Sequence, residues 1–198
     1  MRVAVDHREV ILQTAAKLFA RKPFHEVLME DVAENAGIAK GTIYRFFPNK
    51  DDLFVALSMR YLEMLSTELG EVAAGGGAPL QRLRAMLVRL VEIIDERRDF
   101  FQVMQRQECN LWAHQKGSEF IVRRTAIRTH FVGVLDEARA ARVLRCPFET
   151  TIAADMLLGM VRNMLRFTLP QPAPEKIAEM TLHVFIKGLG YRRNGGPA

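Results

Sequence analysis

A short segment near the N-terminus carries the side chains best suited to binding a polyanion. Two cations, a hydroxyl, a phenol and a glycine lie within residues 40–45, and no acid lies among them. Such groups donate hydrogen bonds to phosphate oxygens and to base edges. A further cation, Lys50, starts the next expected helix, where a positive charge is favourable only beside an anion such as a phosphate. The segment's residues that we expect to face outward are Lys40, Gly41, Thr42, Tyr44 and Arg45.

The residues directly before this cationic segment predict a short helix followed by a glycine turn. Val32 and Ala33 form the inward face of the helix, while its acidic residues are expected to face water. Gly37 ends the helix at a position where positive φ costs little, and Ile38 fills the space before the next helix. The acidic residues that we expect to be solvated are Glu30, Asp31 and Glu34.

The cationic segment itself is predicted to be a helix over residues 40–47. Ile43 and Phe47 lie four residues apart and therefore share the face directed into the core. Pro48 ends the helix, because proline lacks a backbone N–H and restricts the preceding residue. Asn49 is the predicted N-cap of a third helix. A helix, a tight turn and a second helix in this order are typical of proteins that place a recognition helix in the DNA major groove.

Residues 10–57 resemble the TetR family of transcription regulators. The resemblance rests on an amphipathic helix ending in Lys17-Leu18-Phe19, an aromatic residue at Phe24, and the segments DVAENAG and KGTIYRFFPNKDDL. It implies that residues 28–47 form a helix-turn-helix, that the outward residues named above contact double-stranded operator DNA, and that Lys50 contacts a flanking phosphate.

Three positions depart from the family pattern. Leu28 stands where a Ser or Thr usually caps the first helix of the motif, which weakens that cap. Ala39 replaces a common Ser or Thr at the start of the recognition helix and removes one phosphate contact. Phe46 replaces a common His. A helical hairpin without a nucleic-acid role would also explain Gly37 and Pro48, but it does not explain the acid-free face.

The composition agrees with a compact protein that binds a polyanion. The chain has 198 residues, of which 49% are hydrophobic, enough to form a packed core. Its formal net charge is +5, although many arginines lie far from the motif on helix faces expected to be solvated. Cys109 and Cys146 are too few for a disulfide framework and indicate reduced thiols, with a redox sensor as the alternative. Without a signal peptide or an uninterrupted membrane-length apolar segment, we expect a cytoplasmic protein with no membrane partner.

The remaining chain has the periodicity of helices throughout, which predicts an all-α fold of about nine helices. Residues 1–48 are predicted to be the helix-turn-helix DNA-binding domain, and residues 49–198 a larger ligand-binding and dimerisation domain. The third helix is expected to reach about residue 69, before the breaker cluster at residues 75–79. A proline-rich link at residues 170–174 separates the last two helices.

These last two helices carry more apolar residues than a small domain needs for its own core. Two copies of such a pair would form a four-helix dimer interface, and the resemblance implies the same use. The alternative is that the pair packs only on its own subunit. The residues predicted to form the interface are Ile152, Met156, Gly159, Ile177, Thr181 and Val184.

Aromatic and methionine side chains in the middle helices suit a cavity for apolar molecules, although each alone also suits ordinary core. The resemblance implies an effector cavity in the C-terminal domain. The predicted lining is Phe100, Met104, Trp112, Ile127, Phe131, Met160 and Met164. Polar groups that could orient the ligand are Gln105, Glu108, Asn110, His114, His130 and Asn163.

Other chemistries find little support. Glu108, Cys109 and His114 match no metal-ligand spacing, so no metal site and no cofactor are expected. Five histidines have no recognisable nucleophile partner, and the glycine run at residues 75–77 precedes Ala-Pro rather than a phosphate-binding lysine, so we expect no enzyme.

The resemblance therefore implies a ligand-responsive, sequence-specific transcriptional regulator. Repression is the expected mode, with a homodimer on a palindromic operator that a small, largely apolar effector releases; the same residues are consistent with activation. The alternative is a helical binding module for apolar small molecules without DNA activity.

Overall fold

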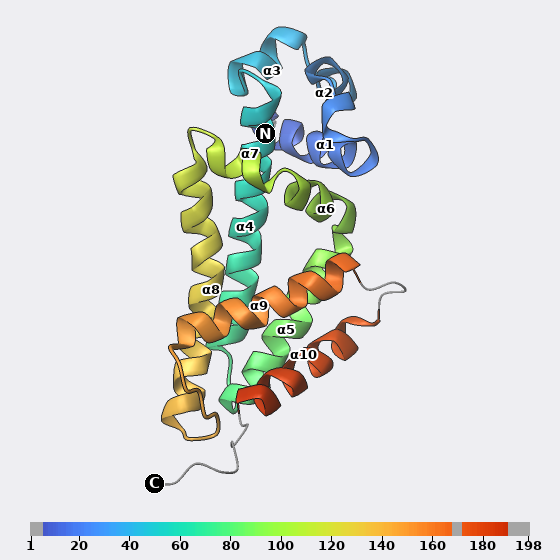
Figure 1. The fold of residues 1–198 in the computed structure, drawn as a ribbon. Coiled ribbons are helices and arrows are strands. Elements are labelled where there is room, and N and C mark those ends of the chain that lie inside the picture. Colours follow the sequence, from blue (N-terminus) through green and yellow to red (C-terminus); the bar gives the residue numbers. More distant parts are fainter. Residues whose placement is uncertain (1–5, 168–171, 190–198) are drawn as a thin grey trace, which may run out of the picture. The chain divides into compact units, whose positions relative to one another are not determined.

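The computed structural model describes residues 6–167 and 172–189. Ten α-helices and one 3₁₀ turn form this part of the chain, and it contains no strand, which confirms the all-α prediction (Figure 1). Two short helices, α6 (Arg98–Arg106) and α7 (Glu108–Ala113), follow each other directly, because Gln107 between them leaves helical geometry. Pro170 and Gln171 of the predicted link lie outside the described residues.

The chain divides into two compact units. The first comprises Met1–Met64 and Glu96–Arg123, and the second comprises Leu65–Asp95 and Arg124–Ala198. Helix α4 (Lys50–Ala74) begins in the first unit and ends in the second, about one turn beyond the predicted end near residue 69. The predicted domain boundary between residues 48 and 49 stays a prediction.

The first unit contains α1 (His7–Arg21), the 3₁₀ turn η1 (Phe24–Glu26), α2 (Met29–Asn35), α3 (Lys40–Phe46), the start of α4, α6, α7 and the start of α8 (Gly117–Ala140). Helix α1 packs against both α2 and α6. Aromatic rings tie these elements together. The ring centroid of Phe54 lies 5.1 Å from those of Phe19 and Phe24, and 5.8 Å from that of Phe100. The core of this unit therefore joins α1, α4 and α6.

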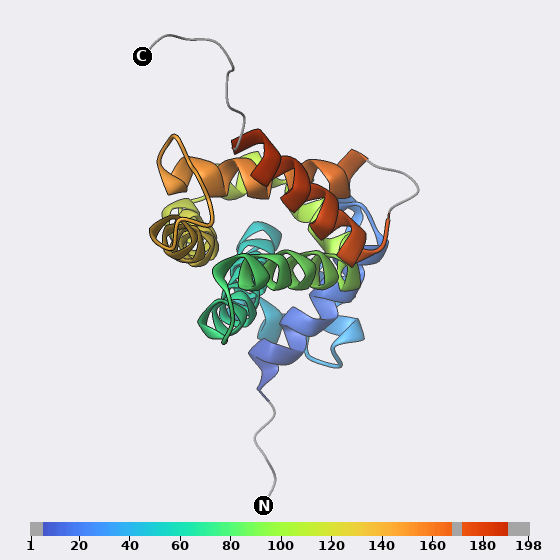
Figure 2. The same ribbon diagram turned by 90° about the horizontal axis from the view of Figure 1, so that it is seen from below.

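The second unit contains most of α5 (Pro79–Glu96), the remaining parts of α4 and α8, α9 (Thr150–Phe167) and α10 (Pro174–Leu189). Figures 1 and 2 show α9 and α10 lying side by side. Between α4 and α8, His130 Nε2 lies 3.0 Å from Ser66 Oγ, a pair the sequence did not reveal. A Cβ atom at Gly70 would lie 2.9 Å from His130 Cε1, so the imidazole occupies the space that a side chain at residue 70 would need.

None of the helices in the described ranges is long and apolar enough to cross a membrane.

Candidate nucleic-acid interface

Helices α2 and α3 are joined by the predicted glycine turn. Gly37 has a φ of +67°, the left-handed conformation that glycine adopts at little cost. The Gly37 N–H donates to Glu34 O at 3.0 Å, and the Ile38 N–H donates to Ala33 O at 3.0 Å. These two bonds satisfy carbonyls at the end of α2 and set the direction in which the chain enters α3.

Helix α3 is anchored through one face and exposes the other. Ile43 is fully buried and Phe47 is 3% exposed, as their spacing predicted. Gly41 has nothing within 4 Å of an added Cβ atom, so packing does not require a glycine there. A glycine on an open face lets another molecule approach the backbone closely. Lys40, Gly41, Tyr44 and Arg45 are exposed, and Thr42 is half-buried.

Glu30 is exposed, as expected from the sequence, but its carboxylate also contacts α3. Its Oε1 atom lies 2.6 Å from Lys40 Nζ and accepts a hydrogen bond from Tyr44 Oη at 3.1 Å. The hydrogen bond from Lys40 holds the pKa of the Glu30 carboxyl below its ordinary value. The same bond raises the pKa of Lys40, while desolvation and the bond to Glu30 raise the pKa of Tyr44. One carboxylate of α2 thus engages two predicted DNA contacts of α3.

Arg45 is the exposed cation of α3 that remains available. Its guanidinium lies 5.4 Å from the centroid of the Phe46 ring, a cation–π distance that leaves the charge in place. No acid pairs with Arg45 among the residues that the structure describes. Asp31, another acid expected to be solvated, lies 3.3 Å from Lys22 Nζ instead. Helix α3 therefore presents one unneutralised guanidinium next to the pair of side chains held by Glu30.

Lys50 is held by backbone carbonyls rather than left at a bare helix N-terminus. Its Nζ donates to Phe24 O at 2.8 Å and to His25 O at 3.1 Å, and it lies 4.7 Å from the Phe24 ring centroid. None of these contacts is with an acid, and η1 fixes the position of the ammonium group. This arrangement could not be predicted from local sequence patterns, because the two segments are about 25 residues apart.

The helix caps of this region are as the sequence predicted. Asn49 caps α4, because its Oδ1 accepts a hydrogen bond from the Asp52 N–H at 2.8 Å. Leu28 and Ala39 occupy the N-cap positions of α2 and α3 without a side-chain hydrogen bond. Leu28 is also 54% exposed, so its apolar side chain contributes little to the core.

The predicted effector lining is divided between the two units. Phe100, Met104 and Trp112 belong to the first unit, where Phe100 and Met104 are buried and Trp112 is 50% exposed. In the second unit Ile127 and Phe131 are buried, while Met160 and Met164 are half-buried. The described residues contain no group of His, Cys, Asp or Glu side chains arranged to hold a metal ion.

The predicted dimer residues fall into two sets. Ile152, Met156 and Val184 are 51%, 52% and 57% exposed, and Gly159 is half-buried. Ile177 and Thr181 are only 1% exposed, and Thr181 Oγ1 lies 3.5 Å from Met164 Sδ of α9. Within the described chain both of these side chains are therefore buried, and Thr181 contacts α9.

The geometry of α2, the turn and α3 defines a helix-turn-helix protein, and the comparison with known families agrees. A model of bacterial regulatory proteins of the tetR family matches residues 11–57, and a model of the Tetracyclin repressor-like C-terminal domain matches residues 76–188. The chain belongs to the tetR family of bacterial regulatory proteins.

Individual relatives support this assignment. The HTH-type transcriptional repressor KstR2 of Rhodococcus jostii (strain RHA1) is 23% identical over 189 residues, which cover 94% of this chain and 93% of KstR2. The HTH-type transcriptional regulator YuxN of Bacillus subtilis is 31% identical over 106 residues, 54% of this chain but 36% of YuxN. The crystal structure of FadR from Bacillus subtilis in complex with stearoyl-CoA has a TM-score of 0.77 at 18% identity, covering 91% of this chain and 98% of FadR, which shows a shared fold.

Proposed function

We propose that the protein is a repressor that binds its operator through α3 and releases it when an effector binds. The observation that carries this proposal is the exposed face of α3, on which Arg45 has no acidic partner in the described part of the chain. Ile43 and Phe47 fix the opposite face in the core. A short helix held in this way can enter a major groove and contact base edges and phosphates.

We propose a homodimer on a palindromic operator. One short recognition helix reads few bases, and two-fold symmetry doubles the contacts. Support comes from exposed apolar side chains on the adjacent helices α9 and α10, since contiguous apolar surface marks interaction sites. The exposed side chains are Ile152, Met156, Phe167, Met180 and Val184.

The effector is proposed to be a small, largely apolar molecule bound by residues 49–198. The stearoyl-CoA bound by FadR carries a long apolar chain, which supports this class of ligand. Effector binding would release DNA by favouring a conformation in which the two recognition helices no longer match their half-sites. To empty an operator that is mostly occupied, the effector must bind this conformation more tightly than it binds the DNA-binding conformation, by several kcal/mol. Helix α4 links the helix-turn-helix to the second unit without a break in the helix.

The test is operator binding by fluorescence anisotropy, with the operator first selected from a random duplex library. Replacing Arg45 by Ala should weaken binding and reduce the dependence of affinity on salt, because fewer counterions are released. Arg139→Ala is the matched control, since Arg139 is an exposed arginine at the end of α8. If no duplex is enriched and Arg45→Ala changes nothing, the rival function, an apolar-ligand module without DNA activity, would be favoured.

A further inference from the structure

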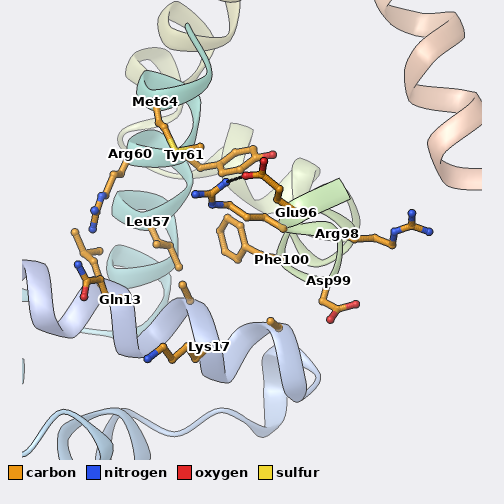
Figure 3. A pocket seen from close by; sticks show the side chains of 14 residues that line it. Gln13, Lys17, Leu57, Arg60, Tyr61, Met64, Glu96, Arg98, Asp99 and Phe100 are labelled. Carbon is orange, nitrogen blue, oxygen red and sulfur yellow. Dashed lines mark hydrogen bonds and ion pairs between the residues drawn. The ribbon is translucent and has the colours of Figure 1, made fainter. Parts of the chain in front are cut away.

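The first unit contains a cavity of about 610 Å³ that is partly open to solvent. Helices α1, α4 and α6, with the end of α5, line it (Figure 3). Its volume falls within the range of about 300–1,000 Å³ that is usual for small-molecule sites. Of the residues predicted to line an effector pocket, Phe100 alone is among the residues that line this cavity.

Small residues on α1 create the space. Leu12, Ala16 and Ala20 are spaced four apart, so they form one face of α1 along the cavity wall. Ala16 and Ala20 reach only one carbon from the backbone, and both remain half-buried rather than fully packed.

The floor of the cavity is apolar and firmly held. Leu57, Tyr61 and Phe100 are each 5% exposed. The Phe100 ring centroid lies 5.8 Å from those of both Tyr61 and Phe54, so aromatic packing fixes its position. A rigid apolar floor binds the body of an apolar ligand without a large cost of ordering.

The charged side chains of the wall favour an anion. Four cations and two acids line the cavity. Two of the cations already have acidic partners. Glu9 pairs with Arg60 and also accepts a hydrogen bond from Gln13 Nε2 at 2.7 Å. A carboxylate oxygen of Glu96 lies 3.1 Å from a guanidinium nitrogen of Arg97. The lining residues with charged side chains are Lys17, Arg60, Glu96, Arg97, Arg98 and Asp99.

Lys17 is the cation of the wall that lacks a partner among the described residues. It lies one turn from Gln13 on the same face of α1, beside Ala16. Asp99, the acid of the wall with no partner in residues 6–167 and 172–189, lies at the other side of the site, and Figure 3 shows its carboxylate directed away from the Phe100 ring. An anionic group near Lys17 would therefore avoid the carboxylate of Asp99 and gain a partner.

We propose that this cavity binds a small amphipathic acid, with its apolar body on Leu57 and Phe100 and its anionic group at Lys17. The site deepens the proposed effector function and rests on it, because most of its lining residues lie within residues 49–198, while α1 of the unit that carries the helix-turn-helix completes the wall. A ligand here contacts both α1 and α6, which pack against each other. Its binding therefore stabilises one arrangement of α1 on α6 over others.

The experiment is a fluorescence titration of the full chain, without DNA, with dansyl-labelled undecanoic acid and separately with the methyl ester of the same probe. Ala16→Trp and Ala20→Phe fill the cavity from α1 and should each remove the saturable signal of the acid. Two filling variants are used so that the test stands if one of them does not fold, and circular dichroism measures the folding of each.

Charge recognition is tested by Lys17→Gln, with Arg21→Gln as the matched control on the same helix outside the cavity. Lys17→Gln should weaken binding of the acid by about two- to fivefold, as expected for an exposed ion pair, and leave the ester unchanged. Arg21→Gln should change neither. The proposal is overturned if the acid binds with unchanged affinity to either folded filling variant, or if Lys17→Gln affects acid and ester equally. Because no DNA is present, these outcomes test ligand binding alone and are read separately from the operator-binding experiment.

Discussion

Glu30 Oε1 of α2 lies 2.6 Å from Lys40 Nζ of α3, so a cation of the proposed DNA-contacting helix is already paired with an acid of the same motif. The same oxygen accepts the hydrogen bond from Tyr44 Oη. Glu30 therefore holds two side chains of the proposed DNA face, and in the proposed complex it would compete with DNA for them.

Replacing Glu30 by Gln should strengthen binding to duplex DNA. The substitution removes a negative charge from the interface and releases Lys40 to a phosphate. An additional phosphate contact increases the salt dependence of affinity by about one unit of slope. Anisotropy titrations of a random-sequence duplex at several salt concentrations measure both effects. Glu34→Gln is the control, because Glu34 is an exposed acid of the same helix with no partner in the described ranges. Equal gains in the two variants would mean that only the net charge matters.

The ionisation of Glu30 should depend on Lys40. The hydrogen bond from Lys40 lowers the pKa of the folded-state carboxyl from 4.5, so the ion pair contributes above the unfolded pKa and is lost as the pH falls through the folded pKa. The contact should therefore persist at neutral pH. Carbon-detected nuclear magnetic resonance of the side-chain carboxyl should give a midpoint below 4.5, and Lys40→Met should move that midpoint upward. A midpoint unaffected by Lys40→Met would contradict the contact.

Leu28→Ser should stabilise the first unit. Leu28 has the extended backbone of an N-cap, with φ −99° and ψ 148°, yet no side-chain oxygen there accepts from the first turn of α2. A serine at an N-cap contributes about 0.5–2 kcal/mol relative to a residue that cannot cap. Urea denaturation should show this increase in the free energy of unfolding. Thr14→Ser is a control outside any cap, and a Leu28→Ser variant no more stable than the parent would show that Leu28 has a compensating packing role.

Ile43→Ala should destabilise the motif far more than a change on its exposed face. Ile43 is fully buried, and truncation of a buried isoleucine to alanine costs about 2–5 kcal/mol. Tyr44→Phe, next to it, should change the free energy of unfolding by about 0.5 kcal/mol or less while weakening DNA binding. Thermal or urea unfolding followed by circular dichroism gives the first quantity and anisotropy the second. A large stability loss in Tyr44→Phe would place Tyr44 in the fold rather than at the interface.

The double variant Met156→Glu and Val184→Glu should dissociate the proposed homodimer. Both side chains are more than half exposed on adjacent helices, so the charges are tolerated in a monomer but must be buried in the dimer. Light scattering coupled to size-exclusion chromatography measures the mass. Val143→Glu introduces the same charge at a residue that is 52% exposed outside α9 and α10. If the double variant keeps the parental mass above that of a monomer, the dimer uses another surface.

Local sequence rules predicted the helix-turn-helix closely. Gly37 has the expected positive φ, Asn49 is the expected cap, and α3 ends one residue before the predicted end. Each of these features depends on residues within about four positions along the chain, which is the range of caps, turns and helical periodicity.

Contacts between distant residues could not be predicted in this way. The Glu30–Tyr44 bond spans 14 residues, and Lys50 reaches carbonyls 25 and 26 residues earlier. The cavity brings together α1 and α6, which are separated by most of the first hundred residues. Their meeting depends on how helices pack, and the pattern of one helix specifies only which face is buried, not what covers that face. For the same reason, Ile177 could be identified as apolar but not as buried against its own chain.

Gly70 and His130 constrain each other across α4 and α8, because the imidazole lies where a Cβ atom of residue 70 would be. Substitution at one position should therefore depend on the residue at the other. Among homologous sequences, a side chain larger than glycine at the position of Gly70 should co-vary with a residue smaller than histidine at the position of His130. The residue types at these two positions should therefore indicate how closely α4 and α8 approach each other in each member of the family.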